Sequence, residues 1–419
     1  ISSHIYFRTK QSIRMSLIQE IFDFIRSLRL QDKLSPRRNP EIIWAYLFFP
    51  AFISYLVILT GFINEKPSIG HIVSLDASLG QLVGSSSKIE VIASGFNWTE
   101  GPLWIYDDSN PHLLFSDTVL NNIYKWEEGK GMFTIGKTMH MVNSGCRDAQ
   151  FNCELRREVG TNGLLRKDDS SLDIIAASHG ERSLMLLRDN GTRSALVSHY
   201  KGKLLNSPND LVWSPDGHLY FTDPHYGLFD HNRQLVDKQL DHNGVYMVKS
   251  DYVRLALQVG EPTAYVRLLE GKMTFPNGLA FSPDYSKLYI ANSDPADPYI
   301  NVYNVADDGS LLGGKVFFNA SSLYQAACME AQEALLPCEG HVGVPDGLKV
   351  DIDGNVYATG PGGVVILSPE GKHLGTLKLD RPASNVAFGG DGRLYITAKD
   401  LLLRVKVKSR PSRIIRKVR

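Results

Sequence analysis

Residues 204–227 read LLNSPNDLVWSPDGHLYFTDPHYG, a complete pattern of turn, strand, turn and strand. Pro208 fixes its own φ and favours an extended Ser207, which predicts a rigid chain reversal at Asn209. The following SPDG has the residues of a β-turn, and residues 218–223 alternate as a β-strand does. The stretch therefore predicts a short antiparallel unit that begins with a polar residue.

The same pattern recurs five more times, which predicts a repeat architecture. Clear copies begin at Phe275 (FPNGLAFSPDYSKLYIANSD), Val344 (VPDGLKVDIDGNVYATG) and Pro382 (PASNVAFGGDGRLYITAKD), and weaker copies begin at Thr99 and Thr161. Short antiparallel sheets repeated around an axis are how a β-propeller protects its sheet edges. We therefore expect an all-β protein with a six-bladed β-propeller.

Each unit places one polar residue just before its first strand, a position that we call the slot. Equivalent positions in successive blades lie at equivalent radii, so the slot residues should converge on one mouth of the central channel. The slot residues are Glu100, Asn162, Asn209, Asn277, Asp346 and Asn385, and the apolar strands that follow them centre on Phe115, Ile174, Tyr220, Tyr289, Tyr357 and Tyr395.

An apolar stretch precedes the repeats. Residues 42–63 (IIWAYLFFPAFISYLVILTGFI) carry no charge and are long enough to span a bilayer. Basic residues are abundant before this stretch and scarce after it, which predicts a cytoplasmic N-terminus and a propeller on the far side of the membrane. No small-residue cleavage site follows, so an uncleaved transmembrane anchor is favoured over a signal peptide, with a buried core helix as the alternative.

The expected organisation follows the chain in order. Residues 1–41 form a basic cytoplasmic segment, 42–63 the anchor, 64–87 a linker, 88–408 the propeller and 409–419 a basic tail. KIEVIA at residues 88–93 is expected to complete the last blade by pairing with LLLRVKV at 401–407. The tail is either solvated or attracted to anionic lipid headgroups. With 45 basic and 45 acidic side chains, the balance of charge does not indicate a nucleic-acid partner.

Two further features favour a lumenal or extracellular propeller. The glycosylation sequons at Asn97, Asn190 and Asn319 all lie beyond the apolar stretch. All four cysteines also lie there, in two insertions that each precede a slot residue and should form a rim over the channel mouth. Four cysteines allow three pairings, and free buried thiols are a further alternative. The simplest prediction is two local disulfides, which would join Cys146 to Cys153 and Cys328 to Cys338.

The repeats resemble a known family. The strings WTEGPLW, LRREVGTNGLL with ASHGERSL, LNSPNDLVWSPDGHLYFTDPHYGL, FPNGLAFSPD with LYIANSD, VPDGLKVDIDGNVYATG and SNVAFGGDGRLYITA are similar to those of the senescence-marker-protein (regucalcin), gluconolactonase and luciferin-regenerating-enzyme family. The resemblance covers residues 89–397. It implies a six-bladed, calcium-dependent lactonase.

The resemblance also implies roles for individual residues. One divalent cation on the axis would be held by Glu100, Asn277 and Asp346, with Asn209 beside it and in contact with substrate. Asp346 would also be the catalytic proton acceptor. Some members have an arginine two residues before that asparagine, where this chain has Ser207. A substrate-binding glutamate of some members has no counterpart here, and His225 occupies that neighbourhood.

The chemistry of the slot residues agrees with this assignment. Two carboxylates and amide oxygens suit Ca²⁺ best, with Mg²⁺, Mn²⁺ or Zn²⁺ as alternatives. A cation can polarise an ester carbonyl while a nearby carboxylate acts as general base. His179 and His225 are expected either to line the channel and bind substrate or to be structural. Asn162 and Asn385 are interpreted as structural.

The expected function is therefore a membrane-anchored, calcium-dependent hydrolase of lactones or related esters. A non-catalytic propeller that binds calcium or a ligand is the alternative from another class, because fold alone does not guarantee activity. A propeller enzyme similar to paraoxonase or strictosidine synthase is a third possibility. The TEGP, SPND and PDGL strings favour the gluconolactonase group over it.

Overall fold

The computed structural model describes residues 66–107, 109–129, 131–134, 153–168 and 171–412. The predicted anchor at 42–63, the basic segment before it, Cys146 and the end of the basic tail lie outside these residues. Within them, no helix combines the length and the apolar character needed to cross a membrane. The anchor therefore stays a prediction.

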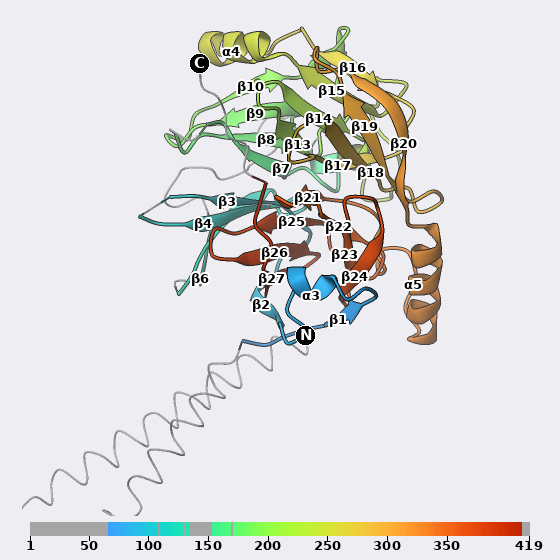
Figure 1. The fold of residues 1–419 in the computed structure, drawn as a ribbon. Coiled ribbons are helices and arrows are strands. Elements are labelled where there is room, and N and C mark those ends of the chain that lie inside the picture. The colour runs from blue at the N-terminus through green and yellow to red at the C-terminus, as the bar shows by residue number, and fades with distance from the viewer. Residues whose placement is uncertain (1–65, 108, 130, 135–152, 169–170, 413–419) are drawn as a thin grey trace, which may run out of the picture. The chain divides into compact units, whose positions relative to one another are not determined.

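Six antiparallel sheets follow one another along the described chain and form the predicted six-bladed propeller (Figure 1). The inner strand of each blade is the one that begins at or near a slot residue. The blades are β3 (Thr99–Ile105), β4 (His112–Asp117), β5 (Asn122–Glu127) and β6 (Gly131–Thr134); β7 (Thr161–Arg166), β8 (Ile174–Ser178), β9 (Ser183–Leu187) and β10 (Arg193–Val197); β13 (Leu211–Trp213), β14 (Leu219–Asp223), β15 (Gly244–Val248) and β16 (Arg267–Glu270); β17 (Pro276–Phe281), β18 (Lys287–Asn292), β19 (Tyr299–Val305) and β20 (Leu311–Asn319); β21 (Leu348–Val350), β22 (Val356–Gly360), β23 (Gly363–Leu367) and β24 (His373–Lys378); and β25 (Asn385–Phe388), β26 (Arg393–Ala398) and β27 (Leu401–Lys406).

The last blade is completed by the start of the described chain, as predicted. Strand β2 (Ile89–Ser94) runs antiparallel to β27, with Ile89 opposite Val405 and Ser94 opposite Leu401. This pairing gives β27 a neighbour on its outer side, so the ring closes without leaving that edge unpaired. The Arg404 guanidinium strengthens the closure, because it binds Glu90 of β2 at 2.7 Å and also pairs with Glu128 of blade one.

The stretch expected to be a linker contributes secondary structure as well. Strand β1 (His71–Ser74) pairs with β24 as a fifth strand of blade five, and the short helix α3 (Leu79–Leu82) follows it. Leu79 and Leu82 are buried in the same apolar cluster as blades five and six. This segment therefore packs against the propeller.

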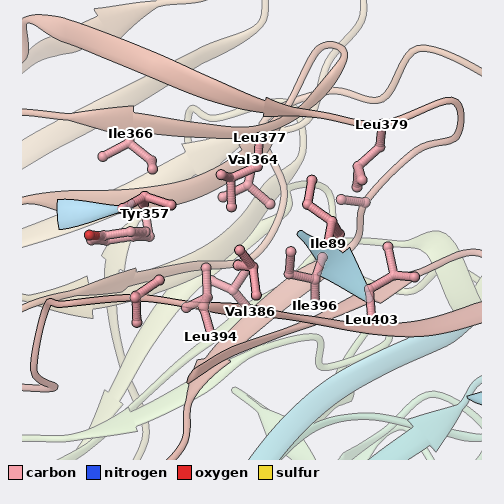
Figure 2. Packing of buried hydrophobic residues seen from close by; sticks show 14 of the residues in the cluster. Ile89, Tyr357, Val364, Ile366, Leu377, Leu379, Val386, Leu394, Ile396 and Leu403 are labelled. Carbon is pink, nitrogen blue, oxygen red and sulfur yellow. The ribbon is translucent and has the colours of Figure 1, made fainter. Parts of the chain in front are cut away.

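Apolar side chains from facing sheets pack together between neighbouring blades. Figure 2 shows one such cluster, in which Val364, Ile366 and Leu377 of blade five lie near Val386 and Ile396 of blade six. Full burial of a side chain of this size stabilises the fold by about 1.5–3 kcal/mol. The strands predicted around Phe115, Ile174, Tyr220, Tyr289, Tyr357 and Tyr395 are the second strands of their blades, and these side chains are all buried.

The remaining elements lie in the connections between strands. They are the hairpin β11 (His199–Tyr200) and β12 (Lys203–Leu204), the helices α4 (Ser250–Val259) and α5 (Ser321–Glu333), and the 3₁₀ turns η2 (Cys153–Leu155) and η3 (Tyr226–Leu228). Helix α5 belongs to the second cysteine-containing insertion.

Candidate functional site

The slot residues differ in how they relate to the inner strands. Asn209 and Asp346 precede their strands, as predicted, whereas Glu100, Asn162 and Asn277 lie inside β3, β7 and β17. The register of each of these three strands shifts just after the slot residue, so the slot residue is part of a β-bulge. A bulge bends its strand and redirects a side chain, which here allows the slot side chain to face the cavity described below.

A glycine follows four of the slot residues because neighbouring inner strands approach each other closely. A Cβ at Gly101 would lie 2.0 Å from the Asn162 carbonyl oxygen, and one at Gly278 would lie 2.3 Å from the Asp346 carbonyl oxygen. The Gly278 N–H donates to that same Asp346 oxygen at 3.2 Å. Asn277 and Gly278 lie within strand β17, where the glycine allows backbone contact between blades.

A cavity of about 310 Å³ brings the predicted cation ligands together. Glu100, Asn209, Asn277 and Asp346 all line it, and so does Asn162, which we had interpreted as structural. They come from five different blades, as the convergence of the slots requires. Asn385, the sixth slot residue, does not line the cavity.

Aromatic and apolar residues form much of the remaining lining. In four units the residue two positions before the slot residue contributes: Trp98, Phe275, Val344 and Ala383. Side chains two positions apart in an extended chain share a face, so this spacing is a signal that sequence reasoning missed. Tyr226 and Phe229 add to the aromatic lining from η3 and the residue after it.

The buried oxygen atoms of the site fit a cation. The Oδ1 atoms of Asn277 and Asp346 are buried without a hydrogen-bond partner, although buried polar atoms are nearly always paired. Glu100 Oε2 accepts the N–H of its own neighbour, Gly101, at 3.2 Å, and the Trp98 side chain also donates to this carboxyl. Among the described residues, no cluster of three or more His, Cys, Asp or Glu side chains is placed to hold a metal. The predicted set instead combines two carboxylates with amide oxygens.

The electrostatics of the cavity also favour a cation. Burial raises the pKa of the Glu100 carboxyl to about 8, opposed by the Gly101 N–H and reinforced by the Asp210 carboxylate. Burial, then the Glu100 carboxylate, raises the pKa of Asp346 well above its usual range. Carboxyl groups in such surroundings resist ionisation unless a positive charge joins them.

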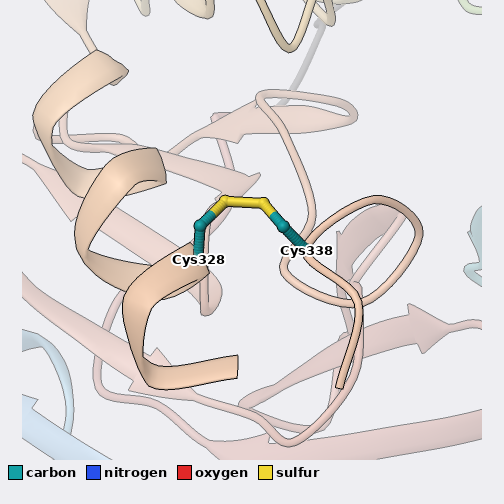
Figure 3. Close-up of a disulfide and its surroundings, with 2 residues drawn as sticks. All are labelled: Cys328 and Cys338. Atoms are coloured by element: carbon teal, nitrogen blue, oxygen red, sulfur yellow. A yellow bond between two sulfur atoms is a disulfide. The ribbon is translucent and has the colours of Figure 1, made fainter. Parts of the chain in front are cut away.

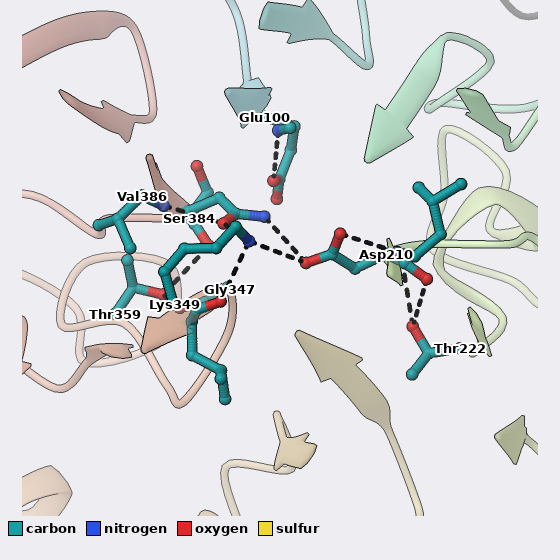
Figure 4. Close-up of polar contacts among 12 residues, drawn as sticks. Glu100, Asp210, Thr222, Gly347, Lys349, Thr359, Ser384 and Val386 are labelled. Atoms are coloured by element: carbon teal, nitrogen blue, oxygen red, sulfur yellow. Dashed lines mark hydrogen bonds and ion pairs between the residues drawn. The ribbon is translucent and has the colours of Figure 1, made fainter. Parts of the chain in front are cut away.

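A second layer of polar residues lies next to these slot residues. Asp210 pairs with Lys349 at 3.7 Å and accepts a hydrogen bond from the Asn385 amide at 3.3 Å. Figure 4 shows Asp210 and Lys349 pointing toward each other, with Glu100 nearby. The Lys349 ammonium offsets the charge of Asp210, and the side-chain bonds of Asn385 within this layer agree with its interpretation as structural.

Neither predicted substrate-binding histidine lines the cavity. His179 is fully buried behind Asn162, with its Nε2 3.5 Å from the Asn162 amide nitrogen. His225 bonds Asn243 at 2.9 Å and packs against the rings of Phe229 and Phe275. Both histidines therefore support residues that line the cavity.

The position that is arginine in some relatives has a structural role here. The Ser207 hydroxyl donates to the Pro224 carbonyl oxygen at 2.7 Å and accepts the Gly227 N–H at 3.0 Å. Ser207 does not line the cavity, and its hydroxyl is engaged by these two backbone groups. The acidic lining residue Glu158, which sequence reasoning missed, comes instead from the segment between η2 and β7.

The second insertion forms part of the rim over the cavity, as predicted. Tyr324 of α5 and residues from the loop after it, including Cys338 and Val342, line the cavity. Cys328 and Cys338 form a disulfide that joins α5 to this loop (Figure 3), which confirms the second predicted pairing. The pairing of Cys146 with Cys153 stays a prediction, because Cys146 lies outside the described residues.

The comparison with known families decides between the predicted groups of propellers. A family model described as the SMP-30/gluconolactonase/LRE-like region matches residues 98–400. The chain belongs to this family. The predicted resemblance is confirmed, and the paraoxonase-like and strictosidine-synthase-like alternatives give way to it.

Individual relatives agree with this assignment. The gluconolactonase of Zymomonas mobilis is 34% identical over 350 residues, which cover 82% of this chain and 87% of that protein. A lactonohydrolase of Aspergillus oryzae is 25% identical over 223 residues, which cover 52% of this chain and 48% of that protein. The structure of a gluconolactonase from Xanthomonas campestris superposes with a TM-score of 0.62 at 26% identity and covers 82% of this chain and 98% of that one. These relatives support the predicted class of enzyme, a hydrolase that acts on lactones.

Proposed function

We propose that this protein hydrolyses lactones or related esters in the cavity lined by the slot residues, and that it depends on a divalent cation, Ca²⁺ by preference. The observation that carries this proposal is the convergence of Glu100, Asn277 and Asp346 on one cavity, where two of them present buried oxygen atoms without partners. The relatives supply the reaction class, and this geometry supplies the residues.

Glu100, Asn277 and Asp346 would hold the cation, with Asn209 beside them. When bound, a cation in such a site polarises the ester carbonyl and lowers the pKa of water. Asn277 is well placed to fix the geometry, because its side chain interacts with both the Tyr226 hydroxyl and the Asp346 carboxyl. The aromatic lining limits access of bulk water to the reacting ester.

Asp346 is the residue that we assign as general base. It lines the cavity and its Oδ1 is free of hydrogen bonds, so this oxygen can accept a proton from an attacking water. Its pKa is raised by burial and by Glu100, and a positive charge beside it would favour the ionised, proton-accepting form. Asn209, on a neighbouring part of the lining, would orient the substrate.

The test is calcium titration calorimetry together with hydrolysis of a lactone panel. Glu100→Gln keeps the shape of the side chain but removes one charge, so Ca²⁺ affinity should fall by about tenfold or more, which is about 1.4 kcal/mol. Asp346→Asn should also lower Ca²⁺ affinity, and lactone hydrolysis should fall by about 10²- to 10⁴-fold through loss of the base.

Asp351→Asn is the matched control. Asp351 belongs to the same blade and is fully buried, but it bonds Asn355 and lies outside the cavity. Its replacement should change neither calcium affinity nor turnover. Normal hydrolysis by Asp346→Asn would show that the assigned site is not the active site. A wild-type protein that binds Ca²⁺ but hydrolyses no lactone or ester would instead be the non-catalytic binding propeller.

We also propose that residues 42–63 anchor the protein in a membrane of the secretory pathway, with the propeller on the lumenal or extracellular side. Two observations support this topology. The sequon residues Asn97, Asn190 and Asn319 are all exposed and thus accessible for glycosylation. The disulfide between Cys328 and Cys338 is typical of an oxidising compartment.

A further inference from the structure

Besides Glu339, which pairs with Arg233, the cavity contains a further carboxylate, Glu158, that the proposed cation site does not use. Its side chain keeps 21% of its surface exposed, and it lines the cavity. Although four acidic residues share this lining, no three acidic, histidine or cysteine side chains among the described residues are close enough to hold a metal. Glu158 therefore belongs to no such cluster, although its charge acts on Glu100 and Asp346, and it is open to a bound substrate.

Asn162 presents a second acceptor on the same side of the cavity. Its Oδ1 is buried and has no hydrogen-bond partner, while its amide nitrogen lies 3.5 Å from His179 Nε2. The amide N–H thus faces the imidazole and the oxygen is left for the cavity. Glu158 and Asn162 both present acceptors, and acceptors recognise donors such as the hydroxyl groups of a substrate.

His179 is placed to orient Glu158. Burial lowers the pKa of His179 to about 3, so the ring is neutral and carries one N–H. Because Nε2 faces the Asn162 amide, that N–H lies on Nδ1. Nδ1 is 3.8 Å from Glu158 Oε2, which is too long for a hydrogen bond, but it has no other partner. The N–H dipole therefore points at the carboxylate.

The space that His179 occupies depends on a glycine. A Cβ at Gly227 would lie 2.5 Å from the His179 Cβ, so only glycine lets the imidazole pack behind Asn162. The rest of the lining suits the faces of a saturated ring, since it includes the aromatic side chains of Trp98, Tyr226 and Phe275. Of these, Tyr226 and Phe275 stack with their ring centres 5.2 Å apart.

We propose that Glu158, positioned by His179 and assisted by Asn162, recognises substrate hydroxyl groups, and that it makes the cavity select a hydroxylated ring lactone over an unsubstituted one. The choice of a lactone rests on the proposed function. The recognition of hydroxyl groups rests on the two hydrogen-bond acceptors, Glu158 and Asn162 Oδ1, that line the cavity. In this chain the carboxylate that recognises the hydroxyl groups comes from the connection between blades one and two. Ser207 and His225 instead form hydrogen bonds with Pro224, Gly227 and Asn243.

The first test measures binding without turnover, using the full-length protein with Ca²⁺. The probe is 1,5-anhydro-D-glucitol, a hydroxylated six-membered ring that has no ester, and tetrahydropyran is the same ring without hydroxyls. Calorimetry should show that the wild type prefers the polyol. Glu158→Gln should weaken polyol binding by about tenfold or more, because hydrogen bonds to a charged acceptor are the stronger kind. Its affinity for Ca²⁺ should fall less than that of Glu100→Gln, because Glu158 acts on Glu100 and Asp346 only through its charge.

Two further variants separate positioning from structure. His179→Asn keeps a donor at the place of Nδ1 and should retain polyol binding, whereas His179→Leu removes the donor and should lose it as Glu158→Gln does. Glu181→Gln is the matched control, because Glu181 lies close in sequence to His179, pairs with Arg193 and is absent from the cavity lining. It should bind the polyol as the wild type does.

Hydrolysis of D-glucono-1,5-lactone and δ-valerolactone completes the test. Glu158→Gln should raise KM for the hydroxylated lactone alone. Polyol binding unchanged by Glu158→Gln, a wild type without preference for the polyol, or an equal loss of kcat for both lactones would each overturn the inference. If the wild type binds the polyol through Glu158 but hydrolyses neither lactone, hydroxyl recognition stands and the proposed lactonase function fails.

Discussion

At the scale of single residues, the glycine after a slot residue matters as much as the slot residue itself. The backbone of one inner strand contacts the next at these glycines, as the hydrogen bond from the Gly163 N–H to the Asn209 carbonyl oxygen at 2.7 Å also shows. A side chain at such a point would push two blades apart. The slot glycines therefore set the distance between the residues that meet in the cavity.

Gly278→Ala tests this role of the slot glycines. Its Cβ would lie 2.3 Å from the Asp346 carbonyl oxygen and 2.6 Å from the Gly347 Cα, both backbone atoms that cannot turn away. We expect a loss of about 1–3 kcal/mol in the free energy of unfolding, as for other overpacked sites. Calcium affinity should fall as well, because Asn277 and Asp346 are displaced. Urea unfolding and calorimetry measure the two effects.

Gly80→Ala is the control for this prediction. A Cβ at Gly80 meets nothing within 4 Å, and the residue lies in helix α3 away from the cavity. It should be neutral or slightly stabilising. Equal stability of Gly278→Ala and the wild type would mean that the blades can separate at no cost.

The acidic residues of the cavity predict how stability depends on pH. Glu100 has a folded-state pKa of about 8 against an ordinary value of 4.5, and burial raises the pKa of Glu158 to about 7. Groups with raised pKa hold protons more tightly in the folded chain than in the unfolded chain. They therefore favour folding at low pH, and this contribution is lost as pH rises from about 4.5 to 8.

Bound Ca²⁺ should offset that loss, since a cation stabilises the ionised carboxylates. The increase in Tm on adding Ca²⁺ should therefore be larger at about pH 8 than at about pH 5. Differential scanning calorimetry in chelator and in Ca²⁺ measures it, and Glu100→Gln should reduce the difference between the two pH values. An increase that is equal at both, or larger at low pH, would contradict the assignment.

At the scale of elements, the rim loop after α5 forms no helix or strand before β21, and the disulfide ties it to the helix together with the packing of Val342 against Ala327 and Ala331. Replacing Cys328 and Cys338 together by Ser should cost about 2–3 kcal/mol in the free energy of unfolding at most, because the closed loop is short. The larger effect should be local. Cys338 and Val342 line the cavity, so a freed loop should raise KM for the lactone more than it lowers kcat.

Steady-state kinetics with and without dithiothreitol tests the role of the rim. Reductant should raise KM of the wild type toward that of the double variant, and it should leave the variant unchanged. Peptide mapping without reductant should recover Cys328 linked to Cys338. Identical KM values for the two proteins would show that the disulfide does not hold the rim.

The elements also show what the sequence was able to predict. Turn residues followed by alternating apolar residues gave the six blades, and the apolar strands around Tyr220, Tyr289 and Tyr357 were located because their side chains must be buried. The pairing of β2 with β27 followed from the need to cover an edge. Strand β1 was missed because HIVS is short and only partly buried, so its pattern hardly differs from that of a linker.

At the scale of the whole molecule, the residues of the site that lie in the repeated units could be predicted from the sequence. Those that lie in the insertions between units could not. Glu100, Asn277 and Asp346 occupy repeated positions, so the symmetry of a propeller brought them together in the sequence argument. Glu158 lies in an insertion that the repeat does not govern, and His225 lies outside the slots. Their places depend on packing between blades, such as the contact of His225 with Phe275, which a single sequence does not display.

The topology of the whole molecule is tested by its glycosylation. If residues 42–63 anchor the chain with its N-terminus in the cytoplasm, then the exposed sequons at Asn97, Asn190 and Asn319 face the lumen and can carry glycans. Endoglycosidase should increase the electrophoretic mobility of the full-length protein, and the triple Asn→Gln variant should show no such change. Sealed microsomes should protect the propeller from added protease. An unglycosylated propeller that the protease digests in intact microsomes would place it in the cytosol, where the disulfide between Cys328 and Cys338 would not be expected to persist.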